Sequence, residues 1–365
     1  MFDLNSSHAS VSGTRARPDI SAPPARDTAV DLLRGLAIAF MVMANMSELL
    51  KEPHPYWYRL SSSFVAPLFI LLAGMMVDYT ARHRGGTAGH YFKRGAMLMV
   101  VAILNDVVNF HIWPMLSCDV LYLIALGIPS SYLLGRAPSW FRWIAIVSIF
   151  AATPFLQKVL GYTDYPTEIY FSSEKSVAAA NPSSPLNHWL VDGWFPIFPW
   201  LGFALLGVQF GEMRRNYRSR RGYSTWAFLL GAVIAALGAY LWKLHPGAQI
   251  IRDVYGELYY PPTIGFVVTT IGVLILLFQF AEPISHWALW KPVEVLGGAS
   301  LAVYLLHLAI ITYILAPRWP GRDFPIFLVI YFTTMVVLTL AAYGLKALKA
   351  RWKNMPEAVK MVVGA

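Results

Sequence analysis

Long apolar runs alternate with short polar segments along most of this 365-residue chain. An α-helix needs about 20 mostly apolar residues to cross the interior of a bilayer. Ten segments of the sequence approach that length. We therefore predict transmembrane helices at residues 32–50, 63–80, 94–112, 117–135, 139–158, 189–212, 224–243, 261–281, 294–315 and 324–345.

This pattern predicts an all-α fold, a polytopic integral membrane helix bundle of about ten transmembrane helices. Residues 27–350 would form the transmembrane domain. Residues 1–26 are rich in Ser, Pro and Ala and lack the apolar core of a signal peptide, which predicts a disordered cytoplasmic tail. Residues 351–365 would form a basic cytoplasmic tail.

Composition agrees with a membrane protein. Only 13% of the residues are charged and 57% are hydrophobic, whereas soluble domains are about 25% charged. The net charge of +9 could indicate a nucleic-acid partner, but the basic residues fall between the apolar runs, so we expect the lipid bilayer and no nucleic acid as partner. The single cysteine, Cys118, excludes an internal disulfide framework and a cysteine-based zinc site, and no metal is predicted.

The basic residues also predict an orientation, because cytoplasmic loops carry an excess of Lys and Arg. If the N-terminus is cytoplasmic, 21 of the 29 Lys and Arg residues lie on the cytoplasmic side and 8 lie on the other. We therefore expect both termini in the cytoplasm and a multi-pass protein of the inner (plasma) membrane.

The first predicted helix has charged residues at its entrance and polar residues at its far end. Asp31 and Arg34 stand at the entrance, and Asn45 and Glu48 follow the apolar run. Charged groups at membrane depth are costly, so they usually pair with one another or line a cavity. We expect the rest of the chain to enclose this helix.

Three polar residues fall at a similar depth in predicted helices that run in the same direction. Asn45 lies 11 residues beyond Arg34, Asp106 lies 12 beyond Arg94, and His307 lies 13 beyond Glu294. At about 1.5 Å per residue these positions are roughly 16–20 Å deep. We predict one buried polar site in the outer half of the bilayer.

Two histidines are candidates for acid–base chemistry. His307 shares one helical face with Ser300 and Tyr304, and it could be a general base or a core histidine bonded to a neighbouring helix. His54, in the segment KEPHPYWYR, could be a constrained catalytic residue or an exposed loop histidine.

Two long outer segments leave a similar choice. Residues 159–188 and 244–260 are either solvated loops or a platform whose Tyr, Asp and Glu side chains hold a polar substrate.

Four stretches together resemble one family. They are VDLLRGLAIAFMVMAN (30–45), FVAPLFILLAGMMV (64–77), FPWLGFALLGVQFGE (198–212) and GGASLAVYLLH (297–307). They are similar to the heparan-α-glucosaminide N-acetyltransferase family and its bacterial relatives, and more distantly to the acyltransferase-3 membrane enzymes. Residues 27–212 resemble the catalytic region of that family.

The resemblance implies a membrane-bound acyltransferase. It would take an acetyl or other acyl group from cytosolic acyl-CoA, with acetyl-CoA as donor substrate, and deliver it to an amino sugar or sugar hydroxyl of an extracytoplasmic glycan. His54 fits a loop histidine implicated in catalysis, and His307 fits a C-terminal histidine. Asn45 fits a family asparagine and favours the acetyltransferase branch. Asp106 joins this catalytic set because it is predicted at the same depth.

The chemistry of acyl transfer is compatible with these residues. A histidine can remove the acceptor's proton or carry the acyl group as an acyl-histidine, and Asn45 or Tyr304 can stabilise an oxyanion. Arg34, with Asp31 beside it, could bind the phosphates of CoA, or it could be a topology-setting arginine paired with that aspartate.

Other classes remain open at this stage. A transporter or flippase for a glycolipid or small solute would also need buried polar groups, but it would show pseudo-symmetric halves and broken helices. A non-catalytic membrane partner of an envelope-synthesis complex is a third reading. The acceptor, N- versus O-acylation and a homodimeric state are not determined by the sequence.

Overall fold

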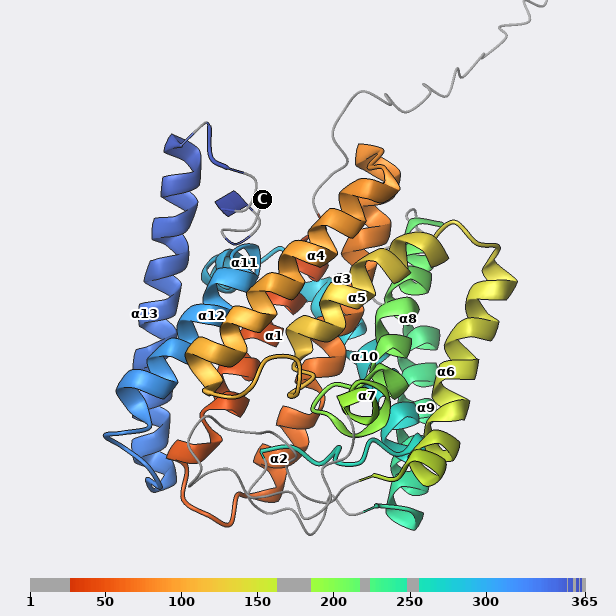
Figure 1. Ribbon diagram of the computed structural model, residues 1–365, viewed down its shortest axis with the longest axis horizontal. Helices are drawn as coiled ribbons and strands as arrows, with labels where there is room; N and C mark the ends of the chain where they lie inside the picture. Colours follow the sequence, from red (N-terminus) through yellow and green to blue (C-terminus); the bar gives the residue numbers. More distant parts are fainter. Residues whose placement is uncertain are drawn as a thin grey trace, which may run out of the picture.

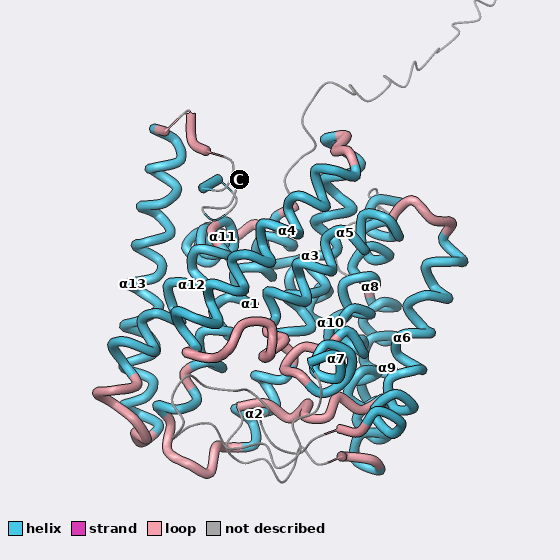
Figure 2. Tube along the Cα trace, viewed as in Figure 1, coloured by secondary structure: helices cyan, strands magenta, loops and turns pink. Residues whose placement is uncertain are grey.

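The computed structural model describes residues 27–162, 185–216, 224–247 and 256–352, with a few positions near the C-terminus. These residues form helices and connecting loops, and no β-strand occurs among them (Figure 2). One isolated bridge joins Leu50 to Arg322. The predicted all-α fold is confirmed. The predicted tail 1–26 and most of the outer segment 159–188 lie outside the described residues.

Each of the ten predicted segments contains a helix. The long helices are α1 (Thr28–Asn45), α3 (Val65–Arg84), α4 (Ala88–Asn105), α5 (Val120–Leu134), α6 (Ser139–Leu160), α8 (Ile197–Asn216), α9 (Thr225–Leu244), α10 (Ile264–Ile284), α11 (Lys291–Gly298) with α12 (Ser300–Ile310), and α13 (Phe324–Arg351). Shorter elements are η1 (Ser47–Leu49), α2 (Tyr56–Ser63), η2 (Asp106–Phe110), α7 (Pro185–Asn187), η3 (His188–Asp192), η5 (Ala288–Trp290) and η6 (Ile311–Leu315).

Several of these helices are long and apolar enough to cross a membrane. Within the described residues there are 6 such helices, or up to 8 when each of two bent pairs counts as one span. Helix α5 has only 15 residues, and α4 opens with the polar residues His90, Lys93 and Arg94. The chain is therefore a multi-pass membrane protein by length and composition. The count of ten spans and the side of each terminus stay predictions.

The predicted span at 294–315 is broken rather than straight. Helices η5 and α11 meet α12 and η6 at an angle of 81°. The break follows Gly297 and Gly298, which are poor helix formers, and Ala299 leaves helical geometry with φ −112° and ψ 28°. The bend turns α12 toward the end of α1.

Helix α1 lies inside the bundle, as expected. It packs against α2, α3, α10, α11, α12 and α13. In contrast α6, α9 and α13 lie at the periphery and expose most of their apolar side chains (Figure 1). Gly35 lets α1 approach α11 closely, because a Cβ there would stand 1.9 Å from the Val293 carbonyl oxygen.

Ion pairs join helix ends at one edge of the bundle, the upper edge in Figure 1. Arg214, near the end of α8, contacts Asp27 before α1 and Glu282 near the end of α10. Arg215 pairs with Asp78 of α3. Helices α2 and α7 lie toward the opposite edge. The candidate site lies on the side of α2.

Candidate functional site

A cavity of about 760 Å³ opens where α1 ends. Its wall comes from the end of α1, the start of α3, η2, the start of α5, the segment 256–260, and α12 with η6. Pockets that hold small molecules usually measure 300–1,000 Å³. The volume is therefore sufficient for a sugar or a similar small molecule.

Asn45 lies on the cavity wall, and its side chain contacts a buried histidine. Asn45 Nδ2 is 2.9 Å from His307 Nε2, and His307 Nδ1 is 3.0 Å from the Val303 carbonyl oxygen. Because a carbonyl oxygen only accepts, Nδ1 carries the proton, and Nε2 of the neutral ring accepts from the Asn45 amide. His307 is 0% exposed, so it sits behind Asn45 and fixes the orientation of the amide.

A second hydrogen bond lies beside the first. Tyr304 Oη donates to Asp119 Oδ2 over 2.8 Å, and both residues line the cavity. Tyr304 precedes His307 by less than one helical turn, and the two rings meet edge to face with centroids 5.4 Å apart. The end of α1, the residue before α5 and helix α12 thus supply polar groups to the same cavity.

The cavity is acidic and aromatic. Three carboxylates line it, those of Glu48, Asp119 and Glu257, and none of its described lining residues is Lys or Arg. The lining also holds aromatic rings: Phe69, Phe110, Trp194, Phe195, Tyr259, Tyr260 and Tyr304. Coulomb repulsion from the carboxylates disfavours a polyphosphate here and favours a neutral or cationic ligand.

Glu257 is a cavity carboxylate whose acidity is altered by burial. Burial raises its pKa to about 7, and the charge of the nearby Arg59 guanidinium opposes that rise. A carboxyl group that titrates near neutrality can accept a proton from a reacting group at physiological pH. Glu257 is therefore a cavity group that can exchange a proton near neutral pH.

The segment that carries Glu257 is held firmly against the bundle. The Leu258 amide donates to Ser63 Oγ over 2.8 Å, and the Tyr259 ring packs against Trp200 with centroids 4.8 Å apart. Gly256 approaches the end of α1, since a Cβ there would be 3.3 Å from the Ala44 carbonyl oxygen. These contacts bring Glu257 to the same cavity as Asn45.

Asp106 lies outside the cavity wall, fully buried and with both oxygens occupied. Oδ2 accepts from the Met115 amide (3.0 Å) and Tyr122 Oη (2.6 Å), and Oδ1 accepts from Ser117 Oγ (2.9 Å). These bonds fix the loop between η2 and α5. That loop ends at Asp119, so Asp106 holds a cavity residue in place.

His54 also lies away from the cavity. It is 7% exposed, with Nε2 3.3 Å from the Leu50 carbonyl oxygen and its ring centroid 5.8 Å from that of Tyr58. Its Nδ1 is buried with no hydrogen-bond partner among the described residues. The structure therefore brings Asn45 and His307 together and leaves His54 apart.

Arg34 and Asp31 stand near the other end of α1. Arg34 Nη1 is 3.8 Å from Asp31 Oδ1. Pairing with Asp31 is one of the two alternatives that the sequence allowed for Arg34, the other being phosphate binding. Eleven residues separate Arg34 from Asn45, or roughly 16 Å along the helix axis. The predicted donor residues and the cavity therefore lie at opposite ends of α1.

The sequence predictions did not single out Glu257 or give Asp119 a role, whereas they named Tyr304 as a possible donor to an oxyanion. Glu257, Tyr259 and Tyr260 belong to the outer segment 244–260, and they line the cavity as a substrate platform would. The signal available was the run ELYYPP (257–262), an acid followed by aromatic residues and prolines. Residues 248–255 of that segment lie outside the described residues.

Comparison with known families gives one result. The family model described as "Heparan-alpha-glucosaminide N-acetyltransferase, catalytic" matches residues 26–242. No curated protein matches the sequence. The matched range contains Asn45, Asp106 and Asp119, whereas Glu257, Tyr304 and His307 follow it in the chain.

Proposed function

Because the chain belongs to the heparan-alpha-glucosaminide N-acetyltransferase family, we propose that it transfers an acetyl group from cytosolic acetyl-CoA to an amino sugar or sugar hydroxyl. The acceptor would belong to a glycan on the far side of the inner membrane. The observation that carries this proposal is the hydrogen bond between Asn45 and His307 at the cavity wall.

The cavity is proposed as the acceptor site. Its carboxylates and aromatic rings suit a sugar that carries hydroxyl groups or an amine, and they repel the phosphates of CoA. In this proposal Glu257 accepts the proton that the acceptor loses as its nitrogen or oxygen attacks the acetyl carbonyl carbon. The bond from that carbon to the CoA sulfur breaks, and CoA leaves as the thiolate.

Asn45 is proposed to touch the reacting atoms. An amide held in one orientation can hydrogen-bond the acceptor or the developing oxyanion without further ordering. His307 is proposed as a positioning residue, because its Nε2 accepts from Asn45 and its Nδ1 donates to Val303. This assignment favours direct transfer over an acyl-histidine at His307.

Two other predicted residues take supporting roles in the proposal. Asp106 positions the loop that ends at Asp119. His54 supports the turn after α1 through Leu50 and Tyr58. Asp31 and Arg34 remain on the donor side, from which the acetyl group would enter along α1.

The test is acetyl transfer by purified protein in nanodiscs. The protein is incubated with radiolabelled acetyl-CoA and a panel of amino sugars, and the products are separated and counted. Label on a sugar supports the proposal. A sealed-vesicle assay with labelled sugar tests the transporter alternative in parallel. If sugar crosses the membrane unacetylated and no label transfers, the enzyme proposal is overturned.

A further inference from the structure

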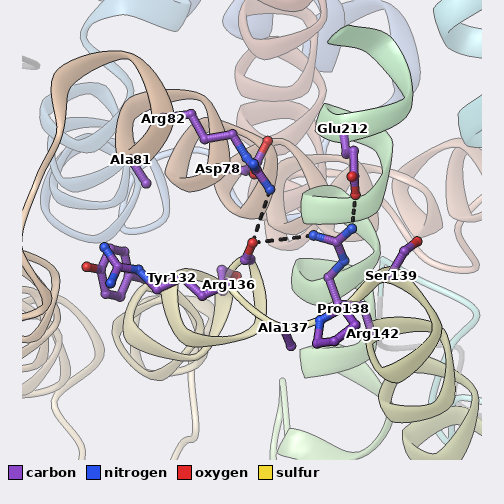
Figure 3. A pocket seen from close by; sticks show the side chains of 12 residues that line it. Asp78, Ala81, Arg82, Tyr132, Arg136, Ala137, Pro138, Ser139, Arg142 and Glu212 are labelled. Atoms are coloured by element: carbon purple, nitrogen blue, oxygen red, sulfur yellow. Dashed lines mark hydrogen bonds and ion pairs between the residues drawn. The ribbon is translucent and has the colours of Figure 1, made fainter. Parts of the chain in front are cut away.

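A second cavity, of about 620 Å³, lies at the opposite, charged edge of the bundle. It is formed by the end of α3, the end of α5, the link from α5 to α6, the start of α6, and α8 (Figure 3). None of its described lining residues belongs to the acceptor cavity.

Arginines dominate this second cavity. Arg82, Arg136 and Arg142 line it, together with the carboxylates of Asp78 and Glu212. Arg82 Nε donates to Asp78 Oδ1 over 2.9 Å, and Arg142 pairs with Glu212 (Figure 3). Asp78 also pairs with a fourth arginine, Arg215.

The site therefore has an excess of positive charge. Four arginines share two carboxylates, which leaves a formal charge of +2 around the cavity. Arg136 is exposed, and its guanidinium lies 4.4 Å from the centroid of the Tyr132 ring. Arg136 therefore adds positive charge to the cavity wall, beside the Tyr132 ring and apart from the other two guanidinium groups (Figure 3).

Two buried donors in the wall have no partner. Arg142 is 2% exposed, and its Nε makes no hydrogen bond among the described residues. Ser131 is 0% exposed, and its hydroxyl is likewise unpaired. A buried donor without a partner destabilises the folded protein, so such groups call for a ligand that accepts a hydrogen bond.

The guanidinium groups of Arg82 and Arg142 also converge. Arg82 Nη2 and Arg142 Nη1 both donate to the Gly135 carbonyl oxygen, over 3.1 and 3.4 Å (Figure 3). Two like charges directed at one neutral acceptor repel each other. An anion with several oxygens would relieve that repulsion and accept from the unpaired donors.

We propose that this second cavity binds a phosphate group, held by Arg82, Arg142 and the Ser131 hydroxyl, with Arg136 adding positive charge at the cavity wall. Two kinds of molecule could supply this phosphate group: a soluble nucleotide such as CoA, or an anionic phospholipid through its headgroup. The exposed rings of Trp140 and Trp143 on peripheral helix α6 are typical of the membrane interface, within reach of lipid headgroups. The proposal does not depend on acetyl transfer.

Binding measurements on the full chain in nanodiscs test the site. One arm uses phosphatidylcholine discs and titrates CoA, dephospho-CoA and inorganic phosphate, following the apparent unfolding temperature. The other arm replaces part of the phosphatidylcholine with phosphatidylglycerol and counts bound lipid by native mass spectrometry. The arm that shows binding identifies the source of the phosphate.

Two variants locate the binding. Arg82→Gln removes an exposed charge and leaves Asp78 paired with Arg215, and Ser131→Ala removes a hydroxyl that has no partner among the described residues, so neither should unfold the protein. We expect each to weaken phosphate binding about tenfold or more, which corresponds to one charge-assisted hydrogen bond. Arg94→Gln, an exposed arginine of α4 outside the cavity, is the matched control and should bind as wild type does.

The proposal is overturned by either of two results. One is that no phosphate ligand in either arm stabilises or binds the wild-type protein. The other is that Arg82→Gln and Ser131→Ala bind as tightly as wild type, which would place the phosphate elsewhere. Because no step of this test measures acetylation, its outcome is separate from that of the proposed function.

Discussion

At the residue scale, Asn45 combines two roles that seldom fall on one side chain. It belongs to the cavity wall, and it donates to a histidine that is completely buried. The histidine cannot turn away, because its other nitrogen donates to the helix backbone at Val303. The orientation of the amide is therefore fixed before any substrate binds, which is the condition for an effective catalytic dipole.

Variants of His307 distinguish a positioning residue from a base. In His307→Gln the side-chain oxygen can still accept from Asn45, whereas in His307→Phe nothing can. We expect acetyl transfer to fall about 100-fold or more in the phenylalanine variant and to be partly restored in the glutamine variant. Steady-state kinetics should show the loss in kcat, with KM for acetyl-CoA close to wild type.

Equal, complete inactivity of both folded His307 variants would contradict this role. A general base cannot be replaced by glutamine, so that result would return His307 to proton transfer. Wild-type rates in the phenylalanine variant would exclude both roles.

The acidity of Glu257 predicts a pH profile. Its pKa is raised to about 7 by burial, so the fraction of the carboxylate form increases as the pH rises through 7. We expect kcat/KM to rise over the same range, half-complete near pH 7, and Glu257→Gln to remove that step along with most of the activity. Glu48→Gln, in the same cavity, is the control that should retain the step. An unchanged profile in Glu257→Gln would contradict the assignment.

At this scale the sequence predicts the depth of the site residues but not which of them meet. Hydropathy and helical rise place Asn45, Asp106 and His307 at one depth, and two of them do meet. Depth does not fix the angle around the bundle, and Asp106 faces the loop before α5 instead. Glu257 could not be placed, because nothing local indicates that its loop packs against α1.

At the element scale, the contact of α1 with α11 determines how His307 is positioned relative to Asn45. Gly35 lies against Val293, and the 81° bend after α11 then directs α12, with His307, toward the end of α1. Any side chain at position 35 would push the two helices apart. The distance from Asn45 to His307 would change with it.

We therefore expect Gly35→Ala to lower both stability and activity. Overpacking of a tight contact costs about 1–3 kcal/mol. The matched control is Gly344→Ala in α13, where an added Cβ meets nothing within 4 Å. Apparent unfolding temperatures in detergent should fall for the first and stay level or rise slightly for the second, because alanine is the better helix former. Equal behaviour of the two variants would contradict the close approach.

The loop before α5 gives a second prediction at this scale. Asp106→Ala leaves the hydroxyls of Ser117 and Tyr122 without their acceptor, while the Met115 amide keeps only its bond to Tyr122 Oη. Each unpaired buried donor costs about 1–3 kcal/mol. We expect a large drop in unfolding temperature together with lost activity. A fully stable but inactive Asp106→Ala would instead indicate direct catalysis by Asp106.

The elements themselves were largely predictable. All ten apolar segments contain helices, because length and apolarity are local properties of the sequence. The short helix α2 and the bend at Ala299 were not predicted. A hydropathy window averages over such features, although the pair Gly297-Gly298 gave a signal for the bend.

At the scale of the whole molecule, the two edges of the bundle have opposite character. One edge carries the arginines of the second cavity and the ion pairs around Arg214 and Arg215, and the other carries the acidic acceptor cavity. This asymmetry suits a protein whose donor and acceptor approach from different sides. The positive-inside rule predicts that the arginine edge is cytoplasmic.

Cysteine labelling tests that orientation. The single native cysteine, Cys118, is 1% exposed, so it should give little background. An impermeant thiol reagent added outside intact cells should label Glu52→Cys, near the acceptor edge, and should label His90→Cys only after lysis. The reverse pattern would invert the topology and contradict a cytosolic donor.

The most direct test of the acceptor site is single-turnover acetyl transfer by the Asn45→Asp variant. The substitution keeps the size of the side chain but removes the Nδ2 donor that contacts His307. Purified wild type and variant in nanodiscs are mixed with radiolabelled acetyl-CoA and an amino sugar that wild type accepts. We predict a rate at least about 100-fold lower for the folded variant with donor binding unchanged. Transfer at the wild-type rate would contradict the assignment of this cavity as the site of acetylation.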